Sequence, residues 1–391
     1  MNGTAPAAVP DAVAPPPGNP RFAGLDAVRG MAALMVLAFH AAGASQTNVL
    51  GGIFRHCDAG VAVFFVLSGF LIYRPMLAAD AGLAPRSSAG RFYWRRFLRI
   101  GPAYWVALIV VSPFTTFAAP SALPNIALLQ VYNLDWFSSG IPAAWTLCVE
   151  LTFYLALPFY AAAARRLLAG FRRRLRAELA LLGAVTLLSL VLREYLLRYN
   201  AGNAYSLLWP PAVLPWFATG MALAAIHVWR PRLRPLVSGW CWAGALAVYL
   251  VTMLSREAGS IGRTTFVAYG LIAGLLVAPA AFGSGRLVAF LRRPALAWLG
   301  LVSFGIYLYH QPIMRLIADN MGSGTSRTLL LFAVVVPAIA CGAASYYLIE
   351  RPVLRLKNLT VQVRVTLAPE CRAAGSAPGT RCRAGSAGHG P

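Results

Sequence analysis

The feature that most constrains this sequence is a series of apolar runs, each about twenty residues long, that recurs along most of its 391 residues. A helix of about twenty apolar residues is long enough to cross the hydrocarbon core of a bilayer. Charged residues make up only 12% of the chain, whereas a soluble domain contains about 25%. Because so little charge would not cover a soluble surface of this size, the sequence predicts a membrane protein.

The runs predict an all-α fold, a polytopic membrane bundle of about ten transmembrane helices. We treat it as one membrane domain rather than as several soluble domains. The polar stretch 118–142 contains prolines and is expected to form a loop or a re-entrant segment. The predicted spans cover residues 25–44, 59–79, 97–117, 143–163, 178–196, 208–228, 236–254, 264–282, 296–317 and 328–349.

Arginine is distributed unevenly between alternate loops. The net charge is +22, and Lys357 is the only lysine. The loops after the second, fourth, sixth and eighth spans are rich in arginine, and the positive-inside rule places such loops in the cytoplasm. Both termini are then predicted to be cytoplasmic, as an even number of spans requires. We expect a multi-pass protein of the inner (plasma) membrane, whose basic charge serves topology and contact with anionic lipid rather than nucleic-acid binding.

The two ends of the sequence differ from the rest in composition. Residues 1–20 contain six prolines and no basic residue, so they lack the charged start and apolar core of a cleavable signal peptide. We predict a disordered leader over 1–20, a membrane domain over 21–358 and a disordered basic tail over 359–391. The tail is expected to be too short and too polar to form a fused extracytoplasmic domain.

Three ionisable residues fall inside predicted spans, in the half that faces outward: His40, Glu150 and His310. Ionisable groups at membrane depth are costly and therefore indicate function. A histidine can act as a general base near neutral pH, and a carboxylate can orient or stabilise it. The alternative for each histidine is a structural hydrogen bond to a neighbouring helix. Arg29 begins the first span, about 16 Å below His40 on one helix.

A second polar cluster lies where the chain enters the third span, in the segment RFYWRRFLRIGPAYW. Its arginines are Arg91, Arg95, Arg96 and Arg99. Guanidinium groups bind phosphates in a bidentate manner, so this cluster can hold a nucleotide-bearing cofactor from the cytoplasm. The alternative is ordinary topology charge with an aromatic belt.

The sequence lacks the motifs that are typical of several other kinds of chemistry. The sequence has no P-loop, no dinucleotide fingerprint and no GxSxG nucleophile elbow. No cluster of His, Cys and carboxylate residues has zinc spacing, so no metal is expected. The six cysteines form no CxxC pair and predict no disulfide framework.

Six stretches, in order over about 25–355, make the chain resemble the acyltransferase-3 family of integral-membrane O-acyltransferases, in the single-domain form without a fused extracytoplasmic domain. The first stretch matches an arginine, ten residues and a histidine, which correspond to Arg29 and His40. The third matches two arginines separated by two residues, which correspond to Arg96 and Arg99. The stretches are LDAVRGMAALMVLAFH, GVAVFFVLSGFLI, RFYWRRFLRIGPAY, AWTLCVELTFYLALP, LVSFGIYLYHQP and YYLIERP.

The resemblance implies a short-chain acyl-CoA donor and a hydroxyl acceptor on a sugar, a surface glycan or a macrolide. It implies that His40 is needed for catalysis and that Arg96 and Arg99, beside Arg95, hold the donor. We expect His40 to deprotonate the acceptor for direct transfer, with Glu150 or Arg29 tuning the site.

The same resemblance suggests that His310, Tyr154 and Trp145 line the site. The fourth stretch has Thr146 where the family has serine, and Thr146 keeps a hydroxyl. Cys148 offers an alternative covalent route, although a cysteine buried in an apolar run is usually inert.

A proton-coupled transporter or exporter is the main alternative function, since intramembrane histidine and glutamate also suit a carrier. The arginine cluster and the absence of a visible internal repeat favour the acyltransferase. The acceptor, the acyl chain length and the oligomeric state are not predicted.

Overall fold

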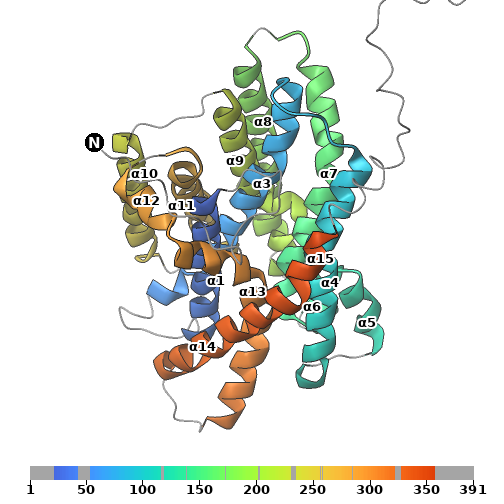
Figure 1. The fold of residues 1–391 in the computed structure, drawn as a ribbon, viewed down its shortest axis with the longest axis vertical. Coiled ribbons are helices and arrows are strands. Elements are labelled where there is room, and N and C mark those ends of the chain that lie inside the picture. The colour runs from blue at the N-terminus through green and yellow to red at the C-terminus, as the bar shows by residue number, and fades with distance from the viewer. Residues whose placement is uncertain are drawn as a thin grey trace, which may run out of the picture.

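A computed structural model describes residues 22–42, 53–115, 119–137, 139–171, 173–200, 203–229, 235–255, 257, 259–283, 285–321 and 327–356. The predicted leader and tail lie outside these residues. All regular structure within them is helical (Figure 1), which confirms the all-α prediction.

Ten helices of 18 residues or more occur in the described part of the chain. They are α1 (Ala23–Ala42), α3 (Ala59–Asp80), α4 (Ala89–Val111), α7 (Trp145–Leu167), α8 (Arg174–Tyr199), α9 (Pro210–Trp229), α10 (Pro235–Thr252), α11 (Arg263–Phe282), α13 (Pro294–Asn320) and α14 (Arg327–Ser345). The shorter helices are α5 (Ala119–Ile126), α6 (Leu134–Phe137), α12 (Arg286–Leu291) and α15 (Arg351–Arg355), and a π-helical segment (Tyr346–Glu350) precedes α15.

Each predicted span coincides with one of the ten long helices. Eight of these ten helices, some with the turns that flank them, are long and apolar enough to cross a membrane. The other two are α10, whose apolar part is the shorter segment Val237–Thr252, and α13. Although α13 has 27 residues, His310 and Gln311 lower its apolar character. The stretch 118–142 contains the short helices α5 and α6 rather than a further span.

The largest difference from the predicted spans is at α4, which begins at Ala89 rather than near residue 97. Arg91, Arg95 and Arg96 therefore lie inside the helix and not in the preceding loop. Arginine is a good helix former, and the Ser88 side chain caps the helix by accepting a hydrogen bond from the Arg91 backbone N–H. The cluster is consequently rigid and shares a helix with Arg99.

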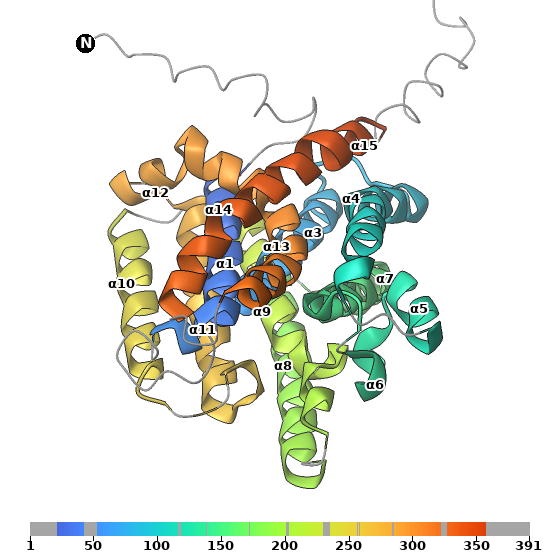
Figure 2. The same cartoon turned by 90° about the horizontal axis from the view of Figure 1, so that it is seen from below.

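The inner part of the bundle is formed by α1, α3, α9 and α13. Helix α3 packs along α9, α1 packs along α13, and α14 lies across α13 (Figures 1 and 2). Helices α10 and α11 pair on one flank, and α4 and α7 form the other. The contacts of α4 and α7 with α3 and α13 are less extensive than the contact of α3 with α9. Arg96, Arg99 and Glu150 lie where these less extensive contacts occur.

Two of the arginine-rich connections meet at one end of the bundle. Asp80, at the end of α3, pairs with Arg86 at 2.6 Å and with Arg165 of α7 at 3.7 Å. The loops after the second and fourth spans therefore lie on the same side, as the alternation of arginine predicts. Which side faces the cytoplasm stays a prediction.

The contact between α3 and α9 depends on two glycines. A Cβ atom at Gly220 would lie 2.0 Å from the Val66 carbonyl oxygen, and one at Gly69 would lie 2.2 Å from the Phe217 carbonyl oxygen. Real side chains do not approach a backbone that closely, so glycine is required for this helix spacing.

We expect Gly220→Ala to destabilise the protein by about 1–3 kcal/mol or more, because α9 must move away from α3. The measurement is the melting temperature of the detergent-purified protein. Gly183→Ala in α8 is the matched control, since no atom lies within 4 Å of its added Cβ. Equal melting temperatures for the two variants would contradict the role of this contact.

Candidate active site

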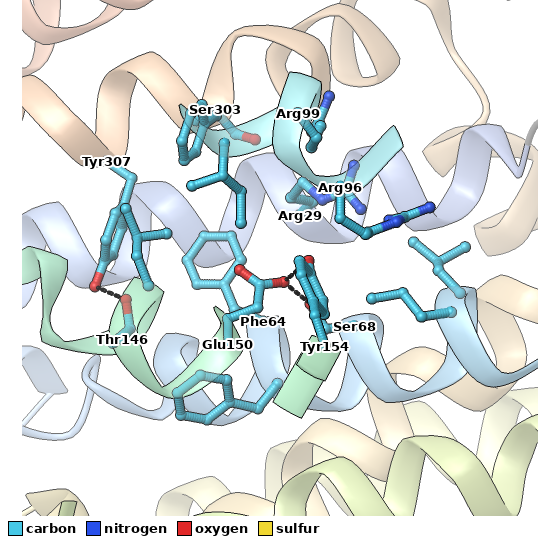
Figure 3. Close-up of a pocket in the computed structure, with 16 residues that line it drawn as sticks. Arg29, Phe64, Ser68, Arg96, Arg99, Thr146, Glu150, Tyr154, Ser303 and Tyr307 are labelled. Atoms are coloured by element: carbon cyan, nitrogen blue, oxygen red, sulfur yellow. Dashed lines mark hydrogen bonds between the residues drawn. The ribbon is translucent and has the colours of Figure 1, made fainter. Parts of the chain in front are cut away.

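A pocket lies between α1, α3, α4, α7 and α13 (Figure 3). Charged residues line one part of it, and hydroxyl groups and aromatic rings line the rest. The lining residues that carry charge or a hydroxyl are Arg29, Ser68, Arg96, Arg99, Thr146, Glu150, Tyr154, Ser303 and Tyr307. Arg29, Arg96, Arg99, Glu150 and Tyr154 are thus brought together as one group, although they come from three helices.

Three arginines form the positive end of the pocket. Arg96 and Arg99 are three positions apart on α4 and therefore share a helix face, and Arg29 approaches from α1 (Figure 3). Arg29 pairs with Asp26 at 3.6 Å. The Arg96 guanidinium lies 5.9 Å from the ring centroid of Phe92 and 5.7 Å from that of Tyr154.

Glu150 is the only carboxylate among the lining residues of this pocket. The hydroxyls of Ser68 and Tyr154 both donate to its Oε1 atom, and Figure 3 shows its other oxygen directed away from them into the pocket. Tyr154 is four residues after Glu150, one helical turn along α7. With three guanidinium groups and one carboxylate, the pocket attracts anions.

A second carboxylate lies behind the arginines. Glu350 ends the π-helical segment and is 3% exposed. It interacts electrostatically with Arg99 and Arg29, and within the described residues its Oε2 atom has no hydrogen-bond partner. A π-helical turn often occurs at functional sites, and here it directs Glu350 toward the arginine group.

The other end of the pocket is closed by a hydrogen-bonded pair. The hydroxyls of Thr146 and Tyr307 lie 2.8 Å apart, and the Tyr307 hydroxyl also donates to the Ala143 carbonyl at 2.9 Å. One turn further along α13, His310 meets His40 of α1. The distance from His310 Nε2 to His40 Nδ1 is 3.1 Å.

The structure separates Glu150 from the histidines that the sequence places at the same depth. Its described hydrogen bonds go to Ser68 and Tyr154, and it lies with the arginines rather than with His40. Tyr307 stands between the two groups, since it lines the pocket and its ring contacts that of His310. The histidine pair is therefore beyond the aromatic end of the pocket.

Three other predicted residues lie elsewhere in the described structure. Arg95 is on α4 but is not a lining residue of this pocket. Trp145 also lies outside the lining and stacks on Phe137 with ring centroids 6.4 Å apart. Cys148 is 1% exposed, and its thiol donates to Gln130 Oε1 at 3.2 Å. No group of three His, Cys, Asp or Glu side chains within the described residues is placed to hold a metal ion.

Four residues at the site escape prediction from the sequence: Ser68, Ser303, Tyr307 and Glu350. Three carry hydroxyls in apolar runs, where the same residue types also serve packing. Glu350 had a clearer signal, because it is an acidic residue at the end of the last apolar run, in YYLIERP.

The fold and the site define a helical membrane protein with an anion-attracting pocket beside a buried histidine pair. The family model described as an acyltransferase domain matches residues 22–347. The chain therefore belongs to the acyltransferase-3 family, and it is a membrane acyltransferase.

Curated relatives are similar over most of this chain. Nodulation protein 10 of Rhizobium leguminosarum bv. viciae is 29% identical over 344 residues, which are 79% of this chain and 85% of the relative. Peptidoglycan O-acetyltransferase OatA of Listeria monocytogenes is 25% identical over 360 residues, 84% of this chain and 55% of that protein.

Exopolysaccharide production protein ExoZ of Rhizobium meliloti is 27% identical over 331 residues, 82% of this chain and 95% of the relative. The chain thus spans most of two of these relatives and about half of OatA. No solved structure gives a significant match to this chain.

The two hydroxyls on Glu150 generate a prediction for acyl transfer. Ser68→Ala and Tyr154→Phe each remove a hydrogen bond to a carboxylate, which typically stabilises by about 1.5–3 kcal/mol. We expect each variant to lose about 10- to 100-fold in turnover, measured with purified protein. Tyr132→Phe is the control, because its hydroxyl bonds to Thr152 on an exposed part of the chain. A loss as large in the control would contradict the assignment.

Proposed function

We propose that this protein transfers a short acyl group, acetyl or similar, from acyl-CoA to a hydroxyl of a sugar or surface glycan at the inner (plasma) membrane. The observation that carries the proposal is a pocket with three arginines at one end and, beyond the Tyr307 and Thr146 that close its other end, the histidine pair. The relatives support a glycan acceptor, since their names refer to peptidoglycan O-acetylation and exopolysaccharide production.

The arginine end suits the donor. Coenzyme A carries several phosphates, and arginine is the side chain best able to bind phosphate oxygens in a bidentate manner. Arg96 and Arg99 lie in the first half of α4, whose start the positive-inside rule assigns to the cytoplasm. The donor would enter there and extend its thioester past Glu150 toward Tyr307.

The histidine end suits proton transfer. Arg29 and His40 are eleven residues apart on α1, a separation of about 16 Å along the helix. A donor whose phosphate is bound by the arginines can therefore extend its thiol arm along this distance toward His40. His40 accepts the proton of the acceptor hydroxyl, whose oxygen attacks the thioester carbonyl. The C–S bond breaks, and the leaving thiolate takes the proton from His40 to give free CoA.

Acetyl-CoA supplied with a panel of glycans and macrolides is expected to yield free CoA and an O-acylated acceptor. We expect His40→Ala to lower kcat by at least about 100-fold, because removal of a general base costs that much. Product mass spectrometry and thiol release are the measurements. Normal turnover by the folded variant would exclude His40 as the base, whereas proton-coupled solute uptake without CoA release would favour a transporter.

Donor binding gives an independent test. We expect Arg99→Gln to raise the KM for acyl-CoA by about 10-fold or more, because a charge-assisted bond to phosphate is lost. Arg91→Gln serves as the matched control, since Arg91 is on the same helix, exposed and not a lining residue. Equal KM values for the two variants would argue against a donor site at this end.

A further inference from the structure

The two histidines of the pair, His40 and His310, are held by hydrogen bonds to each other and to backbone carbonyl oxygens. His310 is 1% exposed, and its Nδ1 atom lies 2.7 Å from the carbonyl oxygen of Tyr307. His40 Nδ1 lies 2.9 Å from the carbonyl oxygen of Val36 and 3.1 Å from His310 Nε2. The described hydrogen bonds of the pair therefore use both ring nitrogens of His310 but only Nδ1 of His40. None of them involves His40 Nε2.

These contacts determine where the protons lie. A carbonyl oxygen only accepts hydrogen bonds, so His310 must carry its proton on Nδ1 to bond to Tyr307. In neutral His310 the Nε2 atom is then an acceptor. His40 Nδ1 faces this acceptor and the Val36 oxygen together, so it must carry a proton as well. In neutral His40 the remaining nitrogen, Nε2, then holds a lone pair.

The opposite tautomers do not fit the same geometry. With both protons on Nε2, the lone pair of His310 Nδ1 would face the Tyr307 oxygen at 2.7 Å. The lone pair of His40 Nδ1 would face the Val36 oxygen at 2.9 Å. Two acceptors in contact repel each other, and such unsatisfied groups are costly away from water.

We propose that His310 is the positioning residue that holds His40 with its proton on Nδ1 and its Nε2 free to act as the base. This inference rests on the proposed function, in which His40 takes a proton from the acceptor. When Nε2 binds that proton, His40 becomes an imidazolium and its Nδ1–H bond to His310 becomes charge-assisted and stronger. The neutral partner stabilises the transient cation without placing a permanent charge in the bilayer.

The packing of α1 against α13 supports the role. These two helices make one of the most extensive contacts in the bundle, so their side chains are held in a fixed register. His40 and His310 are 270 residues apart in sequence and meet only because of this contact. A rigid pair of helices is the support that an oriented catalytic group needs.

Two variants of similar volume separate positioning from packing. His310→Leu removes the acceptor, whereas His310→Gln keeps a carbonyl oxygen that can accept from His40 Nδ1–H. We expect His310→Leu to lower kcat by about 10- to 100-fold with an unchanged KM for the donor. His310→Gln should retain a kcat at least about 3-fold higher than that of the leucine variant. Melting temperatures show whether both proteins are folded.

An unchanged kcat in His310→Leu would overturn the inference. Equal losses of kcat in the two variants, together with lowered melting temperatures, would also overturn it, because they would indicate that His310 serves packing alone. The tautomer of His40 can also be measured directly, in an experiment that depends neither on turnover nor on the folding of a variant. The chain has only five histidines, so ¹⁵N-histidine magnetic resonance of the wild-type protein in lipid can assign each tautomer. We expect His40 to be protonated on Nδ1, and a proton on Nε2 instead would overturn the inference. Wild-type protein that released no CoA would refute the proposed function but leave this tautomer readout intact.

Discussion

The cost of placing charge inside a bilayer is the constraint on which the rest of this structure depends. A charged side chain at membrane depth requires a polar partner or a polar cavity. Arg29, Arg99 and Glu150 come from three helices and satisfy this requirement by sharing one pocket. Between α3 and α9, Gly69 and Gly220 allow the two helices to pack closely.

The two ends of the site have different physical characters. The arginine end gathers three guanidinium groups, with Glu150 in the same pocket and with Asp26 and the buried Glu350 as further carboxylates near Arg29. At the histidine end, each imidazole contacts a backbone carbonyl and the other ring, and no carboxylate or guanidinium takes part in these hydrogen bonds. Such a division suits a reaction in which an anionic donor is held at one place and a proton is moved at another. Tyr307 separates the two ends and contacts both.

Most of the fold follows from local sequence patterns, and the site does so only in part. Every predicted span became a helix, although the start of α4 was misplaced because arginine extends a helix beyond its apolar run. Arg96 and Arg99 were predicted as part of one group, whereas Arg29, which joins them in the pocket, was expected to tune the histidine site. The depth of Glu150 suggested that it meets His40, yet Ser68 and Tyr154 hold it near the arginines. The sequence indicates only the depth of a side chain in the membrane. Which neighbours the side chain meets depends also on the rotation of its helix about its axis and on how the helices pack.

The sequence by itself determined that the chain is a helical membrane protein, because apolar length and the positions of arginine are local properties of each segment. It also marked His40, Glu150 and His310 as ionisable residues that are costly at membrane depth and therefore indicate function. Only the tertiary structure decided which of them meet. The pairing of His40 with His310 joins residues 270 positions apart, and Glu350, at the end of the π-helical segment, interacts electrostatically with Arg99 of α4. Such contacts arise from the packing of whole helices, which no local pattern specifies.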